Sequence, residues 1–365
     1  MSIRLPFREL RRTPNRFVVA TVVLAFLTTL LLFLGALLDG LYLGSTGAIR
    51  AQRSDVIVYS ASSRDSFLRS RITPELRAQV ESIAGVTEVG GIGFVLLGAQ
   101  VPGEDELADV AVAGYQTPPA GVPAPPAGGE GIADSRLRDQ GVDTGDTILV
   151  GPAATPIRII GFVDDTSYLL QGSVWVDLTT WREVQNANRP DAAVADDVVQ
   201  ALVVSGAGDL PTLIDEATGG ATSTLTIDDA VLALPGVKEQ KSVFNQIIYS
   251  TFAVVLAVVG LFFSLLTLER IGLYGVLKAV GATTRRLFAG VLLQALAVAV
   301  VAFAIGSALV GASLLALPAQ VPVQLTAGRF VFTFVGLLVA ATLGSAISLR
   351  RVTKVDPASA IGTGS

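Results

Sequence analysis

Four long apolar stretches constrain what this chain can fold into more than any other feature of its sequence. Phe17–Leu38, Ile247–Leu268, Leu287–Leu317 and Phe330–Leu349 contain no charged residue. A helix rises about 1.5 Å per residue, so roughly 20 apolar residues cross the ~30 Å of hydrocarbon in a bilayer. Each stretch meets this length. The sequence therefore predicts an α-helical membrane protein with four transmembrane helices.

The long segment between the first and second stretches is acidic, whereas the other connections are basic. Residues 41–245 contain 13 basic and 27 acidic residues, a net charge of −14. Residues 1–16, 269–286 and 350–365 together contain 12 basic and 3 acidic residues. Segments rich in Lys and Arg stay in the cytoplasm, and consecutive spans alternate in direction. We therefore expect both termini inside the cell and residues 41–245 outside the membrane.

These two observations predict the organisation of the whole chain. A cytoplasmic amphipathic helix leads into four spans (TM1–TM4), and an extracytoplasmic α+β domain is inserted after the first. The expected bounds are 1–16 for the leading helix, 17–40 for TM1, 41–245 for the inserted domain, 246–268 for TM2, 269–286 for a cytoplasmic link, 287–317 for TM3, 318–329 for a short outer loop, 330–349 for TM4 and 350–365 for the cytoplasmic tail.

Short runs rich in β-branched residues indicate strands in the inserted domain. Thr73, which precedes a proline, is expected to cap a helix. Thr180 and Glu183 have the spacing of a capping box and predict a second helix that starts at Thr180. Residues 118–129 are rich in Pro and Gly and predict a loop. The strand-like runs are Asp55–Tyr59, Ala108–Tyr115, Asp146–Val150, Ile157–Val163, Ser173–Leu178 and Val198–Val204.

Two patterns in the inserted domain favour structural over catalytic interpretations. The adjacent acids Asp164 and Asp165 are expected to be solvated loop residues rather than metal ligands. Gly91 and Gly93, followed by Gly98, lack the spacing of a dinucleotide fingerprint. They predict instead a strand whose backbone another segment approaches closely.

Composition excludes several classes of function. The chain contains no histidine and no cysteine, which removes His-based triads, His–metal centres and thiolate sites. None of its four lysines follows the glycine that a P-loop requires. The apolar stretches hold no charge that could couple to a proton or sodium gradient. A net charge of −5 gives no reason to expect nucleic acid. Because the chain has neither a P-loop nor charges in its spans to couple transport to an ion gradient, we expect a separate ATPase subunit to supply the energy.

The cytoplasmic link carries an apolar stripe between charged ends. Ile271, Tyr274, Leu277 and Val280 recur every three residues in the segment ERIGLYGVLKAVGATTRR. Two interpretations stay open. The link is either an amphipathic helix on the inner membrane surface or a helix that docks in the groove of a partner protein.

This link and the order of the spans resemble the permeases of MacB/FtsX-type ABC transporters. The stretch ERIGLYGVLKAVGATTRRLF is similar to the coupling-helix signature of that family, and TKVDPASAIG is similar to its C-terminal ending. RELRRTPNRFVV resembles its leading helix, and the likeness in the inserted domain is looser. The short four-span form is most similar to the haem-exporter branch.

The resemblance implies a homodimer in the plasma membrane of a bacterium, bound to an ABC ATPase that uses ATP and magnesium. This chain itself is not expected to be an enzyme or to bind a cofactor. It would take a hydrophobic or amphiphilic substrate, haem among the candidates, laterally from the outer leaflet and expel it. The residues expected to couple it to the ATPase are Glu269, Arg270, Ile271, Tyr274, Leu277, Lys278 and Val280.

Residues near the outer ends of the first two spans are the candidates for substrate binding. Tyrosine is a known ligand of haem iron, and Tyr42 and Tyr249 lie at these ends, although both also fit an interfacial aromatic belt. Asp39 is placed either to meet a polar head group or to end the span with a charge in water. The candidate substrate-binding residues are Phe33, Asp39, Tyr42, Phe244, Tyr249 and Phe252.

Small residues at every fourth position form a stripe on each of two spans. Small side chains allow membrane helices to approach closely. We expect Ala36, Gly40 and Gly44 on the first span to form the dimer seam. The stripe from Gly336 to Ser348 on the last span is expected to pack against helices of the same chain.

Two other functions remain as alternatives. An FtsX-like relay would move no substrate and would use the acidic domain to activate an extracytoplasmic cell-wall hydrolase. A membrane-anchored enzyme is the weakest alternative, because His and Cys are absent.

Overall fold

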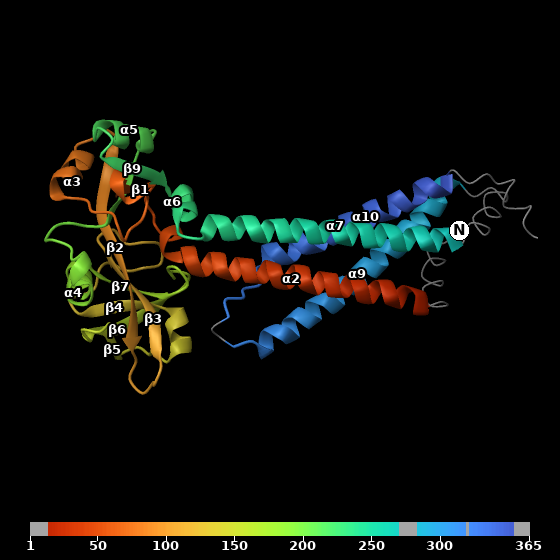
Figure 1. Ribbon diagram of the computed structural model, residues 1–365, viewed down its shortest axis with the longest axis horizontal. Coiled ribbons are helices and arrows are strands. Elements are labelled where there is room, and N and C mark those ends of the chain that lie inside the picture. The colour runs from red at the N-terminus through yellow and green to blue at the C-terminus, as the bar shows by residue number, and fades with distance from the viewer. Residues whose placement is uncertain (1–13, 270–282, 319–320, 354–365) are drawn as a thin grey trace, which may run out of the picture. The chain divides into compact units, whose positions relative to one another are not determined.

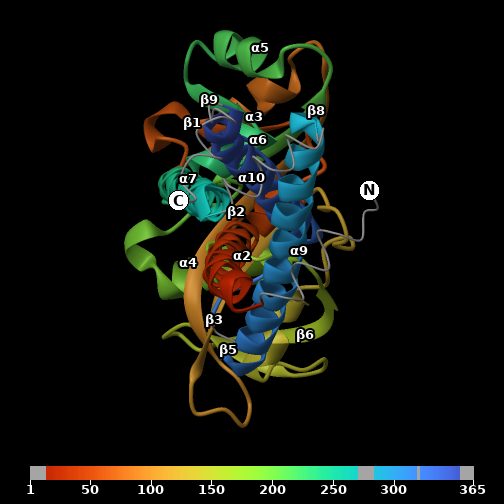
Figure 2. The same cartoon turned by 90° about the vertical axis from the view of Figure 1, so that its right-hand side faces the viewer.

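The computed structural model describes residues 14–269, 283–318 and 321–353. The chain divides into two compact units (Figures 1 and 2). The first, the membrane-helix unit, lies within residues 1–40 and 242–365, and the second, the inserted domain, comprises Leu41–Lys241. Helices α2 and α7 each contribute residues to both units.

Among the described residues, four helices are long and apolar enough to cross a bilayer, which confirms the expected fold class. They are α2 (Pro14–Arg50), α7 (Val237–Glu269), α9 (Thr284–Ala316) and α10 (Ala327–Thr353). Their side chains share one core, to which the helices contribute the fully buried Leu32, Val255, Ala299 and Leu337 in turn. Because lipid is as apolar as this core, close packing rather than removal from water holds such helices together.

Glycines set the distance between α7 and α10. A Cβ added at Gly344 of α10 would lie 2.8 Å from Val259 and 2.9 Å from the backbone of Gly260 on α7. A Cβ at Gly336 would lie 2.5 Å from the ring of Phe252. Both contacts are made within the chain, which confirms the packing expected for this stripe.

A mixed sheet of nine strands forms the inserted domain, in the order β3-β7-β4-β6-β5-β2-β8-β1-β9. β2 also pairs with β3, so β2, β3, β7, β4, β6 and β5 close into a ring that leaves no open edge among them. The pairs β3–β7 and β4–β6 are parallel. The strands are β1 (Val56–Ser60), β2 (Val86–Gln100), β3 (Leu107–Tyr115), β4 (Glu130–Asp134), β5 (Thr147–Val150), β6 (Thr155–Val163), β7 (Gly172–Asp177), β8 (Ala201–Gly206) and β9 (Thr222–Thr226).

Side chains alternate between two cores along these strands, as the pleat requires. On β3, Val110 and Val112 enter one cluster, and Ala111 and Ala113 enter the other. The first cluster joins inward residues of β2, β5, β6 and β7 with Trp181, whose side chain is fully buried.

Glycines in the ring make room for that tryptophan. A Cβ added at Gly93 of β2 or at Gly114 of β3 would lie 2.3 or 2.4 Å from the side chain of Trp181. The close approach predicted for the Gly91–Gly93 segment is therefore confirmed, and β2 runs through it.

Short helices cover the sheet (Figure 1). They are α3 (Pro74–Glu81), α4 (Leu178–Asn188), α5 (Leu210–Ala217) and α6 (Ile227–Ala233), together with the 3-10 helices Ala61–Ser63, Ser135–Gln140 and Pro190–Ala192. Thr73 caps α3 as expected, accepting a hydrogen bond from Leu76 N at 3.4 Å. Residues 118–129 form the expected loop.

The start predicted for α4 is wrong by two residues. The helix begins at Leu178, and the carboxylate of Asp177 accepts hydrogen bonds from Thr179 N at 2.9 Å and Thr180 N at 3.3 Å. A carboxylate is favoured at the N-cap of a helix because it also interacts with the positive end of the helix dipole. The hydroxyl of Thr180 donates to Asp177 and accepts from Gly129 N, so it supports the cap without being it.

Candidate functional site at one end of the membrane helices

Asp39 and Arg329 form an ion pair at one end of the membrane-helix unit. Arg329 Nη2 donates to Asp39 Oδ1 at 2.6 Å, and Thr326 Oγ1 donates to Asp39 Oδ2 at 2.6 Å. The two charged side chains are only 16% and 18% exposed. A charge among apolar helices is costly unless it is paired. Asp39 therefore pairs within the chain rather than ending the span alone in water, and its contact with a substrate head group stays a prediction.

The segment that precedes α10 lies along α2 beside this ion pair. Gln324 N donates to Ala36 O at 2.9 Å. Gly40 leaves room for the carbonyl of Pro322, since a Cβ at Gly40 would lie 2.1 Å from that oxygen. We call these contacts, together with the Asp39–Arg329–Thr326 hydrogen bonds, the clasp.

The three residues expected at a dimer seam are used in contacts within the chain. Ala36 is fully buried, and Gly40 faces Pro322. Gly44 belongs to the inserted domain, where an added Cβ would lie 2.7 Å from the guanidinium of Arg136. A seam at these positions stays a prediction. The exposed apolar side chains of α2 lie on other positions: Val18, Val19, Val22, Val23, Phe26 and Leu30.

Three of the candidate substrate residues are phenylalanines that pack against the core of the membrane-helix unit. Phe33, Phe244 and Phe252 are each partly buried there. Phe252 also meets Phe332 edge to face, with ring centroids 5.8 Å apart. Aromatic side chains from α2, α7 and α10 therefore line this core.

The two candidate tyrosines have different surroundings. Tyr249 on α7 is 64% exposed, as a residue facing lipid or an interface would be. Tyr42 is partly buried against the core of the inserted domain, with Arg50 and Lys241 at 6.0 and 5.9 Å from its ring centroid. The two tyrosines thus belong to different units.

The residues expected to couple to an ATPase lie almost entirely outside the described part of the chain. Glu269 is the last residue of α7. Arg270, Ile271, Tyr274, Leu277, Lys278 and Val280 fall in the segment 270–282, which the structure does not describe.

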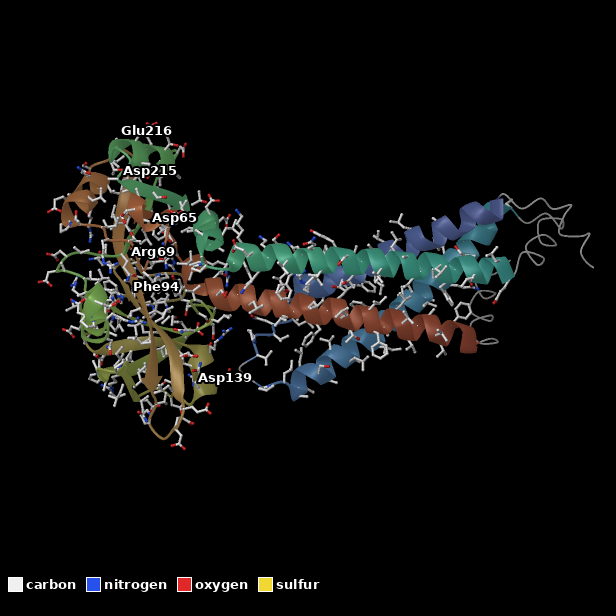
Figure 3. The ribbon with its side chains drawn as sticks, in the orientation of Figure 1. Asp65, Arg69, Phe94, Asp139, Asp215 and Glu216 are labelled. Atoms are coloured by element: carbon white, nitrogen blue, oxygen red, sulfur yellow. The ribbon has the colours of Figure 1, made fainter. Side chains whose placement is uncertain are left out.

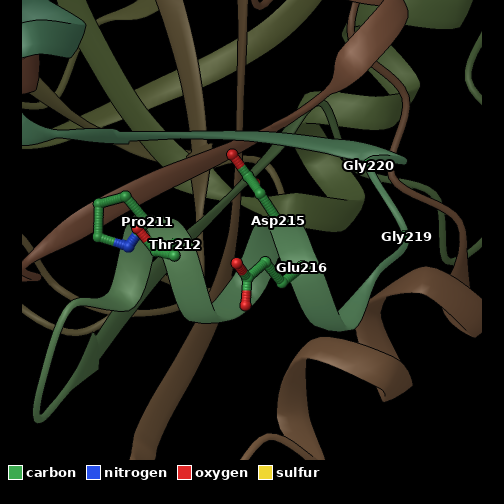
Figure 4. Close-up of a pocket in the computed structure, with 6 residues that line it drawn as sticks. All are labelled: Pro211, Thr212, Asp215, Glu216, Gly219 and Gly220. Atoms are coloured by element: carbon green, nitrogen blue, oxygen red, sulfur yellow. The ribbon is translucent and has the colours of Figure 1, made fainter.

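A surface hollow of about 550 Å³ lies beside α5 (Figure 4). Its lining includes Asp215 and Glu216, both on α5 in Figure 3. The carboxylate of Asp215 accepts hydrogen bonds from the hydroxyls of Thr222 and Thr224 at 2.8 and 2.7 Å, so it holds β9 in place. Within residues 14–269, 283–318 and 321–353, no group of three or more His, Cys, Asp or Glu residues is placed to hold a metal ion.

A buried aromatic cluster fills the other side of the sheet around Phe94, which Figure 3 labels. Phe94 stacks on Tyr168 with ring centroids 4.2 Å apart. Burial raises the pKa of Tyr115 to about 12 and raises the pKa values of Tyr59 and Tyr168 well above the ordinary range. These phenols are therefore neutral structural groups and are poorly suited to bind a cation.

The residues that sequence reasoning missed are the partners of α2 in the clasp: Arg329, Thr326, Gln324 and Pro322. Arg329 is the one charged residue between the third and fourth apolar stretches, and Asp39 lies directly after the first. Two opposite charges at span ends are a usable signal for an ion pair. Thr326 and Gln324 give no such signal, because their roles depend on where the backbone runs.

Comparisons with known proteins agree with this architecture. Residues 246–357 match the FtsX-like permease C-terminal family. Over 99% of its length the chain is 20% identical to a hemin transport system permease protein, HrtB, of Staphylococcus epidermidis, and it covers 100% of that protein. It is 25% identical over 97% of its length to an uncharacterized ABC transporter permease of Mycobacterium tuberculosis, covering 98% of that protein.

Two solved structures are similar to part of the chain. The periplasmic region of MacB from Actinobacillus actinomycetemcomitans superimposes with a TM-score of 0.35 and 12% identity, covering 50% of this chain and 92% of that one. The extracellular domain of the transporter YknZ from Gram-positive bacteria gives 0.33 and 11%, covering 48% and 100%.

Proposed function

We propose that the chain is a permease of the FtsX type and the membrane subunit of an ATP-driven exporter. The proposal is carried by the combination of that domain at residues 246–357 with four helices long enough to span a membrane. The large domain of residues 41–241, inserted after the first membrane helix, is the third feature that supports the proposal. This domain would be extracytoplasmic, because residues 41–245 are acidic and the other connections are basic.

The energy for export would come from a separate ABC ATPase. The chain has no P-loop lysine, and its four apolar stretches hold no charged residue. Asp39 and Arg329, which border two of these stretches, neutralise one another. A permease of this kind transmits the movement of its ATPase through a cytoplasmic helix, for which the stripe of residues 271–280 is the candidate.

The proposed substrate is an amphiphile with a large apolar surface, and haem is the first to test. The name of the Staphylococcus relative motivates this choice. Partly buried phenylalanines on α2 and α7, Phe33, Phe244 and Phe252, offer the flat apolar contacts that such a molecule needs. Lateral access from the outer leaflet, with the exposed Tyr249 at the lipid surface, would bring it to these rings.

A second copy of the chain would complete the transporter. Ile247, Val254, Leu261 and Leu268 on α7 are 39–64% exposed and recur every seven residues. Helices that pack in left-handed pairs show this repeat. We propose α7 rather than the Ala36–Gly44 stripe as the helix that meets the second copy.

The docking of the ATPase is tested by co-purification. Leu277→Asp with Val280→Asp places charges on the apolar stripe and should abolish retention of the ATPase. Ala279→Asp is the control, because it adds a carboxylate beside the stripe rather than on it and should retain the ATPase. An ATPase that remains bound to the double variant contradicts the docking proposal.

The substrate is tested with the complex reconstituted in liposomes. ATPase activity is measured with haem, a macrolide, a lipid and a peptide. Stimulation by haem alone supports haem export, and its loss in Tyr249→Phe or Tyr42→Phe supports ligation by that tyrosine. Stimulation by none of the four, together with a septation defect on deletion of the gene, favours the signal relay.

A further inference from the structure

The last turns of α2 lie inside the inserted domain, where the loop of residues 164–171 holds them. Leu170 N donates to Gly44 O at 2.9 Å, and Leu169 N donates to Ser45 O at 3.0 Å. A carbonyl oxygen has two lone pairs and can accept from outside the helix as well as within it. Two consecutive amides of the loop are therefore bound to two consecutive carbonyls of the helix.

Further contacts bring the start of the loop against the helix. Ala48 N donates to Ser167 O at 2.9 Å. The guanidinium of Arg50 binds both carboxylate oxygens of Asp165, at 2.6 and 3.1 Å. Asp165 is nevertheless 56% exposed, as expected of a solvated loop residue. Gly47 permits this approach, because a Cβ there would lie 2.7 Å from Asp165 O.

The turn that presents the two amides is conformationally disfavoured. Tyr168 and Gln171 exchange backbone hydrogen bonds of 2.9 and 3.0 Å, and the two residues between them, Leu169 and Leu170, have φ values of 49° and 70°. This is the pattern of a type I′ turn, for which Asn-Gly is the preferred sequence. A Cβ crowds the backbone at positive φ, so two leucines in succession are held there only by their surroundings.

The other end of the loop is anchored independently of the helix. The carboxylate of Asp134, at the end of β4, is 2% exposed. It accepts hydrogen bonds from Thr166 N at 2.7 Å, from Thr166 Oγ1 at 2.8 Å and from Ser167 Oγ at 3.2 Å. Residues 166–167 are thus fixed to the sheet, while the leucine turn beyond them depends on α2.

We propose that the 164–171 loop is a conformational sensor of helix α2. Its left-handed turn forms when the carbonyls of Gly44 and Ser45 accept the amides of Leu169 and Leu170, and it relaxes when the helix is displaced. The hydrogen bonds to the helix offset the disfavoured backbone of the turn. Without them, the leucines return to negative φ.

The turn is connected to the centre of the inserted domain. Leu169 packs against the aromatic cluster, and Tyr168, the first residue of the turn, stacks on Phe94 at 4.2 Å. Relaxation of the turn would displace the side chains of Leu169 and Tyr168 from these contacts. A small displacement of α2 would therefore be converted into a rearrangement of a buried aromatic core.

Hydrogen exchange of the full chain in lipid nanodiscs tests the proposal. The amides of Leu169 and Leu170 should exchange slowly in the unmodified protein. Gly47→Val forces the loop off the helix and should speed their exchange by about tenfold or more. Gly161→Ala is the matched control, because a Cβ at Gly161 meets nothing within 4 Å, and it should leave the exchange unchanged.

A second pair of substitutions isolates the disfavoured turn. Gly47→Val should also speed exchange of the Gln171 amide, which donates to Tyr168 O inside the turn. Leu169→Asn with Leu170→Gly should restore slow exchange of this Gln171 amide in the Gly47→Val background, because Asn-Gly forms the turn without help from the helix. Failure to restore it overturns the proposal. Equal protection of the leucine amides with and without Gly47→Val overturns it as well.

Folding of the variants is checked by the fluorescence of the buried Trp175 and Trp181. If Gly47→Val does not fold, Arg50→Gln removes the ion pair to Asp165 without adding bulk and should speed exchange in the same direction. Because neither an ATPase nor a substrate is present, the result is independent of the proposed transport.

Discussion

Arg329 follows Asp39 by 290 positions in the chain, yet its guanidinium donates to that carboxylate at 2.6 Å. The pair connects the first and last of the four membrane helices, and Thr326 supplies a second hydrogen bond to the same carboxylate. The α9–α10 connection is thereby attached to α2 at three levels: Ala36, Asp39 and Gly40.

Removal of either charge of the clasp should destabilise the membrane-helix unit. We expect Asp39→Asn and Arg329→Gln each to cost about 2 kcal/mol, because each leaves a poorly solvated partner charge behind. The double variant should cost less than the sum of the two. Thermal unfolding in detergent measures this double-mutant cycle. Strictly additive losses would show that the two charges do not interact.

A larger side chain at Gly344 should separate α7 from α10. Gly344→Leu is expected to cost about 1–3 kcal/mol through overpacking against Val259 and Gly260. Gly311→Leu is the control, since a Cβ at Gly311 meets nothing within 4 Å. Thermal unfolding of the two variants in the same detergent distinguishes them. Equal losses would contradict the packing of α10 on α7.

The cap of α4 should depend on Asp177 and not on Glu183. Asp177→Ala removes the acceptor for two backbone amides and is expected to cost about 1 kcal/mol or more. Glu183→Ala, which would break a capping box that started at Thr180, should change the free energy of unfolding little. Denaturant unfolding followed by the fluorescence of Trp181, on the same helix, makes the comparison.

Alkaline pH should destabilise the inserted domain through Tyr115. Burial raises the pKa of this phenol to about 12, and its hydroxyl donates to Pro123 O at 2.8 Å. The folded state therefore retains a proton that the unfolded chain loses near pH 10. The stability that Tyr115 contributes is fully present below about pH 10 and is lost as the pH rises through about 12.

The alkaline prediction is checked by comparing the unmodified chain with Tyr115→Phe. The free energy of unfolding should fall less steeply in the variant above pH ~10, and the difference in tyrosinate absorbance should report the titration of Tyr115 itself. Parallel stability curves would show that this phenol has no raised pKa.

The spans were predictable from sequence because a membrane imposes a length and forbids charge within it. Local sequence patterns also predicted the cap at Thr73 and most of the strands. It missed the extent of β2, Val86–Gln100, since glycines are rare in strands and this one contains Gly90, Gly91, Gly93 and Gly98. Gly93 is there because Trp181 of α4 occupies the space of its side chain, a contact between residues far apart in sequence.

The candidate site was predicted less well because its contacts are long-range. The sequence indicated that Asp39 stands at the end of an apolar stretch, but the identity of its partner depends on how α10 packs against α2. Ala36, Gly40 and Gly44 are predicted to form a dimer seam, and in the structure they make close contacts within the chain. Their partners are a loop and an arginine of the same chain, which composition alone does not distinguish from a second copy.

Helix α2 runs without a break from Pro14 to Arg50 and carries the clasp contacts at Ala36–Gly40 and the contacts to the 164–171 loop at Gly44–Arg50. Adding or deleting one residue between Gly40 and Gly44 would rotate everything beyond it by about 100° and shift it by about 1.5 Å. Each set of contacts belongs to one of the two compact units, so both sets could still form after such a change, with the second set turned about the helix axis. A chimaera that exchanges the inserted domain should therefore be joined between Gly40 and Gly44 with the number of residues unchanged, so that Gly44–Arg50 is exchanged together with the loop that it contacts.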